Sequence, residues 1–374
     1  MDRRSFFKQA GLGVTAGLSG ALVSKSVAAQ APQTSANNLP EITWRLASSF
    51  PRSLDTIFSA ADSVSKKVAV ATGGKFQIQV FAAGEIIPAF GVLDAVRDEM
   101  VEMAHTASYY FFGKNPVYAF DAAVPFGLNN RQMDAWYRMG NGLTLMRNFF
   151  AQSNIYNIPC GNTGTQMGGW FRKEIKSVED FKGLKMRIGG FAGKVLAKLG
   201  ALPQQIPGGE VYRSLEQGVI DAAEWIGPYD DQKLGFQKIA KNYYYPGWWE
   251  GSTNFSMYIN KDRWQSLPAE YQAILTAACG DTHVEVLAAY DAKNPLALKQ
   301  LVDVGVQLKP FPNEVLEACF QAAVEVYEET CSKNPTFKNI FDDFSRFRQE
   351  QLAWFKVNEA AFSSFSQQRE VFKK

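Results

Sequence analysis

The chain has 374 residues, of which 46% are hydrophobic and 20% are charged, and its formal net charge is +2. This composition is typical of a globular protein and excludes intrinsic disorder. The length exceeds what one hydrophobic core usually serves, so we expect two domains.

The N-terminus predicts an export signal. Arg3 and Arg4 are followed by two phenylalanines and a lysine, then by an uncharged apolar segment at 10–23 and small residues at 26–29. This pattern is typical of a twin-arginine signal, with an ordinary Sec signal as the alternative. We assign residues 1–31 to the twin-arginine signal peptide and cleavage region, and we expect the mature protein in the periplasm.

Removal of the signal changes the charge. It takes away four basic residues and one acidic residue, so the net charge falls from +2 to about −1. A near-neutral protein has no electrostatic footprint for nucleic acid, which we exclude as a partner. An anionic ligand must therefore be held by a local charge. No later stretch has the roughly 20 apolar residues that a membrane-spanning helix needs.

The first part of the mature chain alternates strands and helices. Alternating or short apolar runs predict the strands, and apolar residues at helical spacing predict the helices. The order β-α-β-α-β favours a mostly parallel sheet covered by helices. The expected strands are 43–47, 76–81 and 103–107, and the expected helices are 57–71 and 89–99.

A second set with the same order begins near residue 155, so we expect two α/β lobes with a hinged cleft between them. Its strands are expected at 155–160, 166–172, 185–188 and 220–225, with a short turn-helix-turn at 178–183 and helices at 192–199 and 210–217. A strand at 254–260 should cross between the lobes. Long helices should follow at 268–299, broken near Asn294-Pro295, and at 313–331 and 340–362.

Cysteines and histidines are too few for most catalytic or zinc sites. The cysteines are not spaced as C-x-x-C, and Cys319 and Cys331 should not pair unless a helix ends between them. The only histidines are His105 and His283, which poorly supplies a zinc site or a histidine-based triad.

Two charged residues at expected strand ends are candidate ligand-binding groups. Arg187 ends one strand before Gly189-Gly190, where a guanidinium fork could hold a carboxylate and glycines could let backbone approach a ligand. Glu224 ends another strand beside Trp225. A buried carboxylate needs a cation or an arginine as partner, so an internal Glu224–Arg187 ion pair is the alternative to a ligand site.

Further candidates are polar or aromatic. Gln166 lies in a Gly-Thr-rich turn and could direct its amide oxygen inward, although such turns are usually only turns. Tyr109, Tyr110 and Trp225 could form aromatic walls, and the Pro-Gly-rich segment 246–251, with two tryptophans, could be a lid or a wall.

These segments resemble those of the tripartite ATP-independent periplasmic (TRAP) transporter receptors. The resemblance covers roughly residues 41–365 and includes E-M-A-H-T-A-S-Y-Y at 102–110, A-V-P-F-G-L at 123–128, F-K-G-L-K-M-R at 181–187 and G-V-I-D-A-A-E-W at 218–225. Within that family the chain most resembles the branch that binds 2-oxo-monocarboxylates such as pyruvate. Many members have proline two residues after the arginine, where this chain has Gly189.

The resemblance implies a fold and a function. It implies an α/β, two-lobed periplasmic binding protein fold with a hinged cleft and long C-terminal helices. Lobe I would comprise 41–160 plus about 252–290, and lobe II 161–251 plus about 291–374. The implied function is that of a non-enzymatic receptor that delivers a 2-oxo acid to the integral-membrane subunits of a TRAP transporter. The C-terminal helices could support a homodimer.

The resemblance also implies roles for the candidate residues. Arg187 would clamp the substrate carboxylate, and a sodium ion would lie between protein and substrate. The ligands of that ion would be the side-chain oxygen of Gln166, the carboxylate of Glu224, the backbone carbonyl of Trp225 and, further, Glu250. Tyr109, Tyr110 and Trp225 would wall the substrate. Calcium is the alternative ion, because one branch of the family uses calcium with lactate.

Other functions stay open at this point. The same class of receptor could bind lactate with calcium, a longer oxo acid or a dicarboxylate, although a dicarboxylate should need a second basic residue. An exported hydrolase or lyase is disfavoured, because neither G-x-S-x-G nor H-E-x-x-H occurs.

Overall fold

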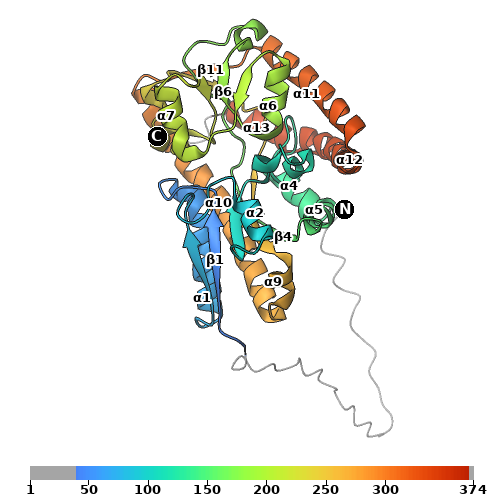
Figure 1. Ribbon diagram of the computed structural model, residues 1–374. Coiled ribbons are helices and arrows are strands. Elements are labelled where there is room, and N and C mark those ends of the chain that lie inside the picture. Colours follow the sequence, from blue (N-terminus) through green and yellow to red (C-terminus); the bar gives the residue numbers. More distant parts are fainter. Residues whose placement is uncertain (1–38, 370–374) are drawn as a thin grey trace, which may run out of the picture. The chain divides into compact units, whose positions relative to one another are not determined.

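The computed structural model describes residues 39–369 and is built around two β-sheets (Figure 1). The predicted export signal at 1–31 lies outside the described residues. The first sheet, sheet A, has the order β2-β1-β3-β10-β4, and β1 pairs in parallel with both β2 and β3, as predicted. Its strands are β1 (Ile42–Ser48), β2 (Phe76–Phe81), β3 (Met103–Thr106), β4 (Ile155–Asn162) and β10 (Asn254–Asn260).

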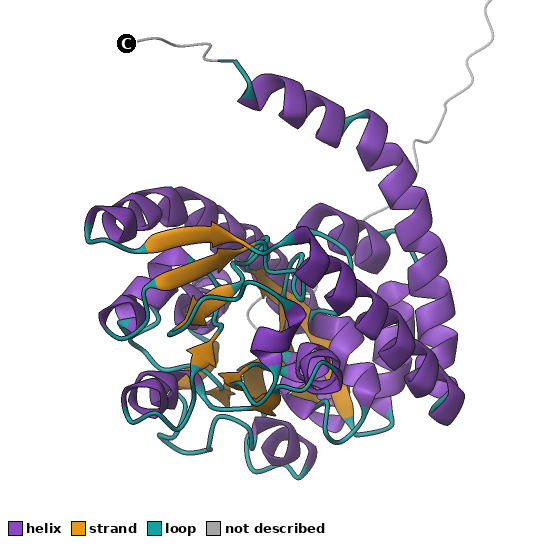
Figure 2. Cartoon of the chain, turned by 90° about the horizontal axis from the view of Figure 1, so that it is seen from above, coloured by secondary structure: helices purple, strands orange, loops and turns teal. Residues whose placement is uncertain are grey.

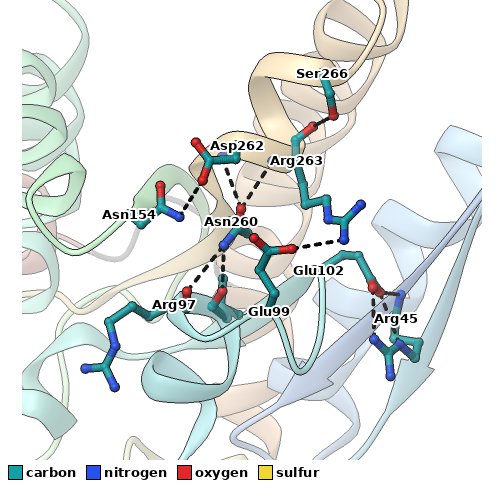
Figure 3. A network of polar contacts seen from close by, with 10 residues as sticks. Arg45, Arg97, Glu99, Glu102, Asn154, Asn260, Asp262, Arg263 and Ser266 are labelled. Carbon is teal, nitrogen blue, oxygen red and sulfur yellow. Dashed lines mark hydrogen bonds and ion pairs between the residues drawn. The ribbon is translucent and has the colours of Figure 1, made fainter.

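Strand β10 is the long-range element of sheet A. It inserts antiparallel between β3 and β4, and all its residues are buried. Asn260 fixes its end (Figure 3): the side-chain oxygen accepts hydrogen bonds from the backbone N–H groups of Asp262 and Arg263, and the amide nitrogen donates to the carbonyl of Val96. Asn260 thereby caps the following helix and ties β10 to the segment before β3.

The second sheet, sheet B, has the order β11-β9-β5-β8-β6-β7. The predicted strands 166–172 and 220–225 shorten to Gly169–Phe171 and Ala222–Ala223. Before the first of these, Met167 and Gly168 donate their backbone N–H groups to Ile226 and Tyr244 outside the regular ladder. The strands are β5 (Gly169–Phe171), β6 (Lys185–Arg187), β7 (Leu202–Gln204), β8 (Ala222–Ala223), β9 (Asn242–Tyr245) and β11 (Gln307–Pro310).

Helices surround both sheets. They are α1 (Asp55–Ala71), α2 (Val92–Arg97), α3 (Ala119–Ala122), α4 (Asn130–Arg138), α5 (Gly142–Ala151), α6 (Gly190–Lys198), α7 (Gly208–Glu216), α8 (Pro228–Leu234), α9 (Lys261–Ser266), α10 (Ala269–Asp303), α11 (Asn313–Lys333), α12 (Pro335–Val357) and α13 (Glu359–Gln367). Short 3₁₀ helices occur at η2 (Ser108–Phe111), η3 (Pro116–Tyr118), η4 (Val178–Phe181) and η5 (Phe236–Lys238).

The predicted break near Asn294-Pro295 is wrong, because α10 continues through Pro295 for 35 residues. Proline costs the helix one backbone hydrogen bond, but packing holds the axis on both sides of it. Tyr290 and Ala297 are buried, and the side chain of Asn294 accepts a hydrogen bond from the N–H of Tyr229 in α8. Helix α10 packs against α1 and against β4 of sheet A, and it also packs against α8, which follows β8 of sheet B.

The C-terminal helices differ slightly from the prediction. The expected helix at 340–362 is two helices, α12 and α13, which meet at Asn358. Figure 2 shows α13 extending away from the sheets, and none of its residues is buried. Cys319 and Cys331 lie on one continuous helix, α11, about 18 Å apart at 1.5 Å per residue, so they cannot pair.

Candidate functional site

The predicted charged residues meet at one edge of sheet B. Strands β6 and β8 run in parallel with Arg187 beside Ala223, so Arg187 and Glu224 emerge together at the carboxyl ends of these strands. The Arg187 Nη1 group donates to the Glu224 carbonyl at 2.7 Å and to the Glu224 carboxylate. Its Nε donates to the carbonyl of Ile206 at 3.2 Å. The internal ion pair that the sequence left open is therefore present.

Both partners of this ion pair are buried, with exposed side-chain fractions of 1% for Arg187 and 0% for Glu224. Burial raises the pKa of Glu224, while the Arg187 charge and a hydrogen bond from the Gly189 N–H act to lower it. The pair does not use all its groups: Arg187 Nη2 and Glu224 Oε2 are buried without a partner within residues 39–369. One donor and one acceptor thus remain for a further group.

Gln166 supplies a second acceptor. It lies just before β5, which runs antiparallel to β8, so the start of β5 reaches Glu224. The side-chain Nε2 donates to the hydroxyls of Thr163 at 3.2 Å and Thr253 at 3.1 Å. With the nitrogen held in this way, the buried Oε1 has no partner among the described residues and is left as an acceptor. The sequence predicted an inward amide oxygen at Gln166, and Oε1 is buried here.

Glu250 joins the same cluster through Thr253. The Thr253 hydroxyl donates to Glu250 Oε2 at 2.5 Å, so one threonine bonds both Gln166 and Glu250. Burial and the nearby Glu224 charge raise the pKa of Glu250 to about 8, against lowering by Thr253, Arg187 and Gln166. Two carboxyl groups and an amide oxygen therefore lie close together, and one of the carboxyls is readily neutral.

Aromatic side chains from both sheets close the site. Tyr109 and Tyr110 lie in η2 after β3 of sheet A, with ring centroids 5.0 Å apart. Trp225 comes from sheet B, and the Arg187 guanidinium carbon lies 4.7 Å from its ring centroid. A narrow cavity, too tight to hold a water molecule, lies between them and is lined by Phe50, Ile57, Tyr109, Tyr110, Trp225, Ile226 and Phe255.

The glycine pair after Arg187 makes room for part of the aromatic wall. A Cβ at Gly189 or Gly190 would lie 2.9 Å or 2.8 Å from Tyr109, and Gly190 has a φ of +59°. Substitution of either glycine would therefore displace Tyr109, which follows β3 of sheet A; the approach of backbone to a ligand stays a prediction.

The tryptophan-rich segment 246–251 holds Glu250, but its rings do not line the cavity. Trp248 stacks on Phe126 at 5.3 Å, and Trp249 packs edge-on against Phe311 at 6.0 Å. Both rings are buried. Besides the Glu250 side chain, this segment contributes a main-chain contact to the site, because the Gln166 N–H donates to the Glu250 carbonyl.

The donor set fits a hard cation. Oxygen atoms of carboxylates, amides and carbonyls are the ligands that sodium- and calcium-like ions prefer. Within residues 39–369 no group of three or more His, Cys, Asp or Glu side chains is placed to hold a metal. A cation here would therefore need the Gln166 amide and a backbone carbonyl besides Glu224 and Glu250.

Sequence reasoning missed the residues that orient this site. Thr163 and Thr253 hold Gln166, and the Ile206 carbonyl holds Arg187. Thr253 lies 87 residues from Gln166 along the chain. No local pattern reports a contact of that range, so only the folded structure identifies it.

Comparison with known proteins decides the family. The model of the bacterial extracellular solute-binding proteins, family 7 (DctP), matches residues 47–334. The chain belongs to this family. It is also 47% identical over 328 residues to a monocarboxylate 2-oxoacid-binding periplasmic protein of Nostoc, covering 88% of this chain and 90% of that protein. The resemblance inferred from the sequence motifs is confirmed.

Solved structures of the family share the fold. A TRAP transporter solute-binding protein of Bordetella bronchiseptica, with copurified calcium and picolinate in a mixed-occupancy dimer, is 48% identical with a TM-score of 0.86 over 87% of this chain and 97% of that one. A receptor of Pseudoalteromonas atlantica with bound sodium and pyruvate is 38% identical with a TM-score of 0.85, over 89% and 100%. The predicted two-sheet α/β architecture with long C-terminal helices is thus confirmed.

Proposed function

We propose that this family member is the receptor of a TRAP transporter and binds monocarboxylate 2-oxo acids, such as pyruvate, together with a sodium or calcium ion. The observation that carries the proposal is a set of buried atoms without partners among the described residues of this site: Arg187 Nη2, Glu224 Oε2 and Gln166 Oε1. Relatives that bind pyruvate with sodium, or picolinate with calcium, support it.

Arg187 would hold the substrate carboxylate. Its Nε and Nη1 are already engaged by Ile206 and Glu224, which fixes the plane of the guanidinium. The remaining Nη2 is a charged donor in a buried site, where a hydrogen bond to a carboxylate is strong. Trp225, stacked on the same guanidinium, would then lie against the substrate together with Tyr109 and Tyr110.

Glu224, Gln166, the Trp225 carbonyl and Glu250 would hold the cation. When bound, the cation supplies positive charge that neutralises Glu224, which would otherwise repel an anionic substrate. A 2-oxo acid can bind one ion through its oxo oxygen and a neighbouring carboxylate oxygen at the same time. A simple carboxylate of equal size offers only the two oxygens of its carboxylate group. The substrate-binding set remains Arg187, Gln166, Tyr109, Tyr110 and Trp225.

Charge counting relates Glu250 to the choice of ion. With Glu250 neutral, Arg187 and a sodium ion balance Glu224 and the substrate carboxylate. With Glu250 ionised, one further positive charge is required, and calcium supplies it.

The sheets support the proposed division into lobes. Lobe I, 41–160 plus about 252–290, would carry β1 to β3, β10 and all but the last two residues of β4. Lobe II, 161–251 plus about 291–374, would carry the strands of sheet B. Helix α10 would pass from one lobe to the other. Opening about this division would separate Tyr109 and Tyr110 from Trp225, beside which they lie in this structure.

We further propose that the protein works in the periplasm as a non-enzymatic receptor, exported through its twin-arginine signal. Among residues 39–369, no helix combines the length and hydropathy of a membrane span. A homodimer through the C-terminal helices is the proposed assembly. The exposed side chains of Trp354, Val357, Phe362 and Phe365 on α12 and α13 support it.

Calorimetry tests the function. Protein stripped of ions with a chelator would be titrated with pyruvate in potassium buffer alone, with added sodium, and with added calcium. Binding should require one of the added ions, and the ligand should be recovered unchanged. Equal affinity in all three buffers would exclude a role for the cation, and conversion of the ligand would show an enzyme. Lactate and succinate, titrated in the same way, represent the hydroxy-acid and dicarboxylate alternatives.

A further inference from the structure

A polar cluster outside the ligand site joins elements of the two sheets. Asp55 begins α1, which packs on sheet A, whereas α8 follows β8 of sheet B. From α8, Lys233 Nζ donates to Asp55 Oδ1 at 2.6 Å, and the Tyr229 hydroxyl donates to Oδ2 at 3.0 Å. From α10, Lys293 Nζ lies 3.9 Å from Oδ2 and donates to Thr56.

The cluster is built around one carboxylate. The ammonium groups of Lys233 and Lys293 lie 4.8 Å and 4.6 Å from the centroid of the Tyr229 ring, so they share both Asp55 and that ring. Partial burial acts to raise the pKa of Asp55. The hydrogen bonds and the two positive charges outweigh this effect and lower the pKa, so the carboxyl is held ionised. The cluster is therefore an organised network and more than one isolated surface pair.

Helix α8 is attached directly to the ligand wall. Only Ile226 and Gly227 separate Trp225 from the start of α8 at Pro228. The Ile226 N–H donates to Asp231 at 3.3 Å, and its carbonyl accepts from the Met167 N–H at 3.1 Å next to Gln166.

Asp230 continues this attachment. It accepts a hydrogen bond from the Tyr290 hydroxyl of α10 at 2.8 Å, and α8, to which it belongs, begins only three residues after Trp225. A shift of α8 therefore moves Trp225, the residue that stacks on Arg187.

We propose that Asp55 is a positioning residue for ligand binding: its cluster with Tyr229, Lys233 and Lys293 holds α8, and with it Trp225, against the sheet A elements that carry Tyr109 and Tyr110. The inference rests on the proposed function. Because the cluster residues do not line the cavity, they contribute to retention of the ligand and not to its recognition. Their removal should speed dissociation.

The main test is Asp55→Asn, which keeps the size of the side chain and removes its charge. With pyruvate and saturating calcium, we expect a two- to fivefold rise in Kd, carried by koff, since a partly exposed ion pair contributes at most about 1 kcal/mol. Asp62→Asn is the matched control, because Asp62 lies two turns further along α1. It should leave both constants unchanged.

A double-mutant cycle identifies the partner. Lys233→Gln should raise koff to a similar extent. The koff of the double variant should be only slightly higher than that of the more impaired single variant. Raising ionic strength with potassium chloride should raise koff of the native protein towards that of Asp55→Asn. Fully additive losses would refute the pairing.

Loss of a first-turn carboxylate can also weaken α1 itself. Thermal unfolding of the ligand-free variants separates this effect, because a lower Tm with an unchanged koff would refute a role in binding. If the native protein binds no 2-oxo acid under any condition, the proposed function fails. If it binds and Asp55→Asn has the native koff, only the present inference fails.

Discussion

Replacement of Arg187 by alanine should weaken binding and stability by separable amounts. The guanidinium makes three hydrogen bonds within the protein, to Ile206 and to the carbonyl and carboxylate of Glu224, and keeps Nη2 for the substrate. Loss of a buried charged donor to an anionic ligand costs about 2–5 kcal/mol. We therefore expect Kd for pyruvate to rise at least roughly 30-fold.

The same substitution leaves Glu224 buried without its cation. Breaking such a pair costs about 3–5 kcal/mol, and protonation of Glu224, whose pKa is already raised, should reduce the loss. Since folded proteins are stable by about 5–15 kcal/mol, the variant should fold with a lower Tm.

A double variant, Arg187→Met with Glu224→Gln, separates the two effects. It removes both charges, so it should recover much of the lost stability and none of the binding. Calorimetric titration with pyruvate and urea unfolding measure the two quantities. Affinity within threefold of the native value in Arg187→Ala, in a folded protein, would refute Arg187 as the carboxylate clamp.

Three further predictions each concern a single residue. Gly208→Ala should weaken pyruvate binding about tenfold or more, because its Cβ would lie 2.4 Å from the Trp225 ring, whereas Gly209→Ala meets no atom within 4 Å and should bind normally in the same titration. Glu250→Gln should retain sodium-supported binding and weaken calcium-supported binding; a parallel loss with both ions would contradict the charge balance. Burial lowers the pKa of His105 to about 4. Between about pH 6.5 and pH 4 the unfolded protein therefore binds a proton at this residue that the folded protein does not, so the contribution of neutral His105 to stability should be lost as the pH falls through this range. His105→Met should reduce this loss relative to the native protein in urea unfolding at pH 7 and pH 4.5, and identical pH slopes would count against the argument.

The periodic elements were predictable because their signals are local. Strands 76–81 and 254–260 have the predicted bounds, since each alternates apolar and polar residues or is flanked by turn residues. The helices predicted at 192–199 and 210–217 end at Lys198 and Glu216, each shortly before a glycine. The strands near 166–172 and 220–225 were overpredicted, because their ends make loop contacts that alternation does not reveal.

The prediction of a helix break at Pro295 was wrong for a related reason. Proline lowers the stability of a helix interior whatever surrounds it, and the sequence shows only that cost. The compensating packing of Tyr290, Ala297 and Asn294 against other elements is long-range. Tertiary contacts therefore outweighed a correct local preference.

The sequence by itself determined the kinds of group available: one arginine and one glutamate at strand ends, an amide oxygen, aromatic side chains and too few histidines or cysteines for most metal and catalytic sites. Only the tertiary structure decided that Arg187 pairs with Glu224 while each keeps one atom unused, that Thr253 orients Gln166, and that Gly189 accommodates Tyr109. The physical reason is that residue type and periodicity are properties of neighbouring residues, whereas hydrogen bonding and burial depend on groups that folding brings together from distant parts of the chain.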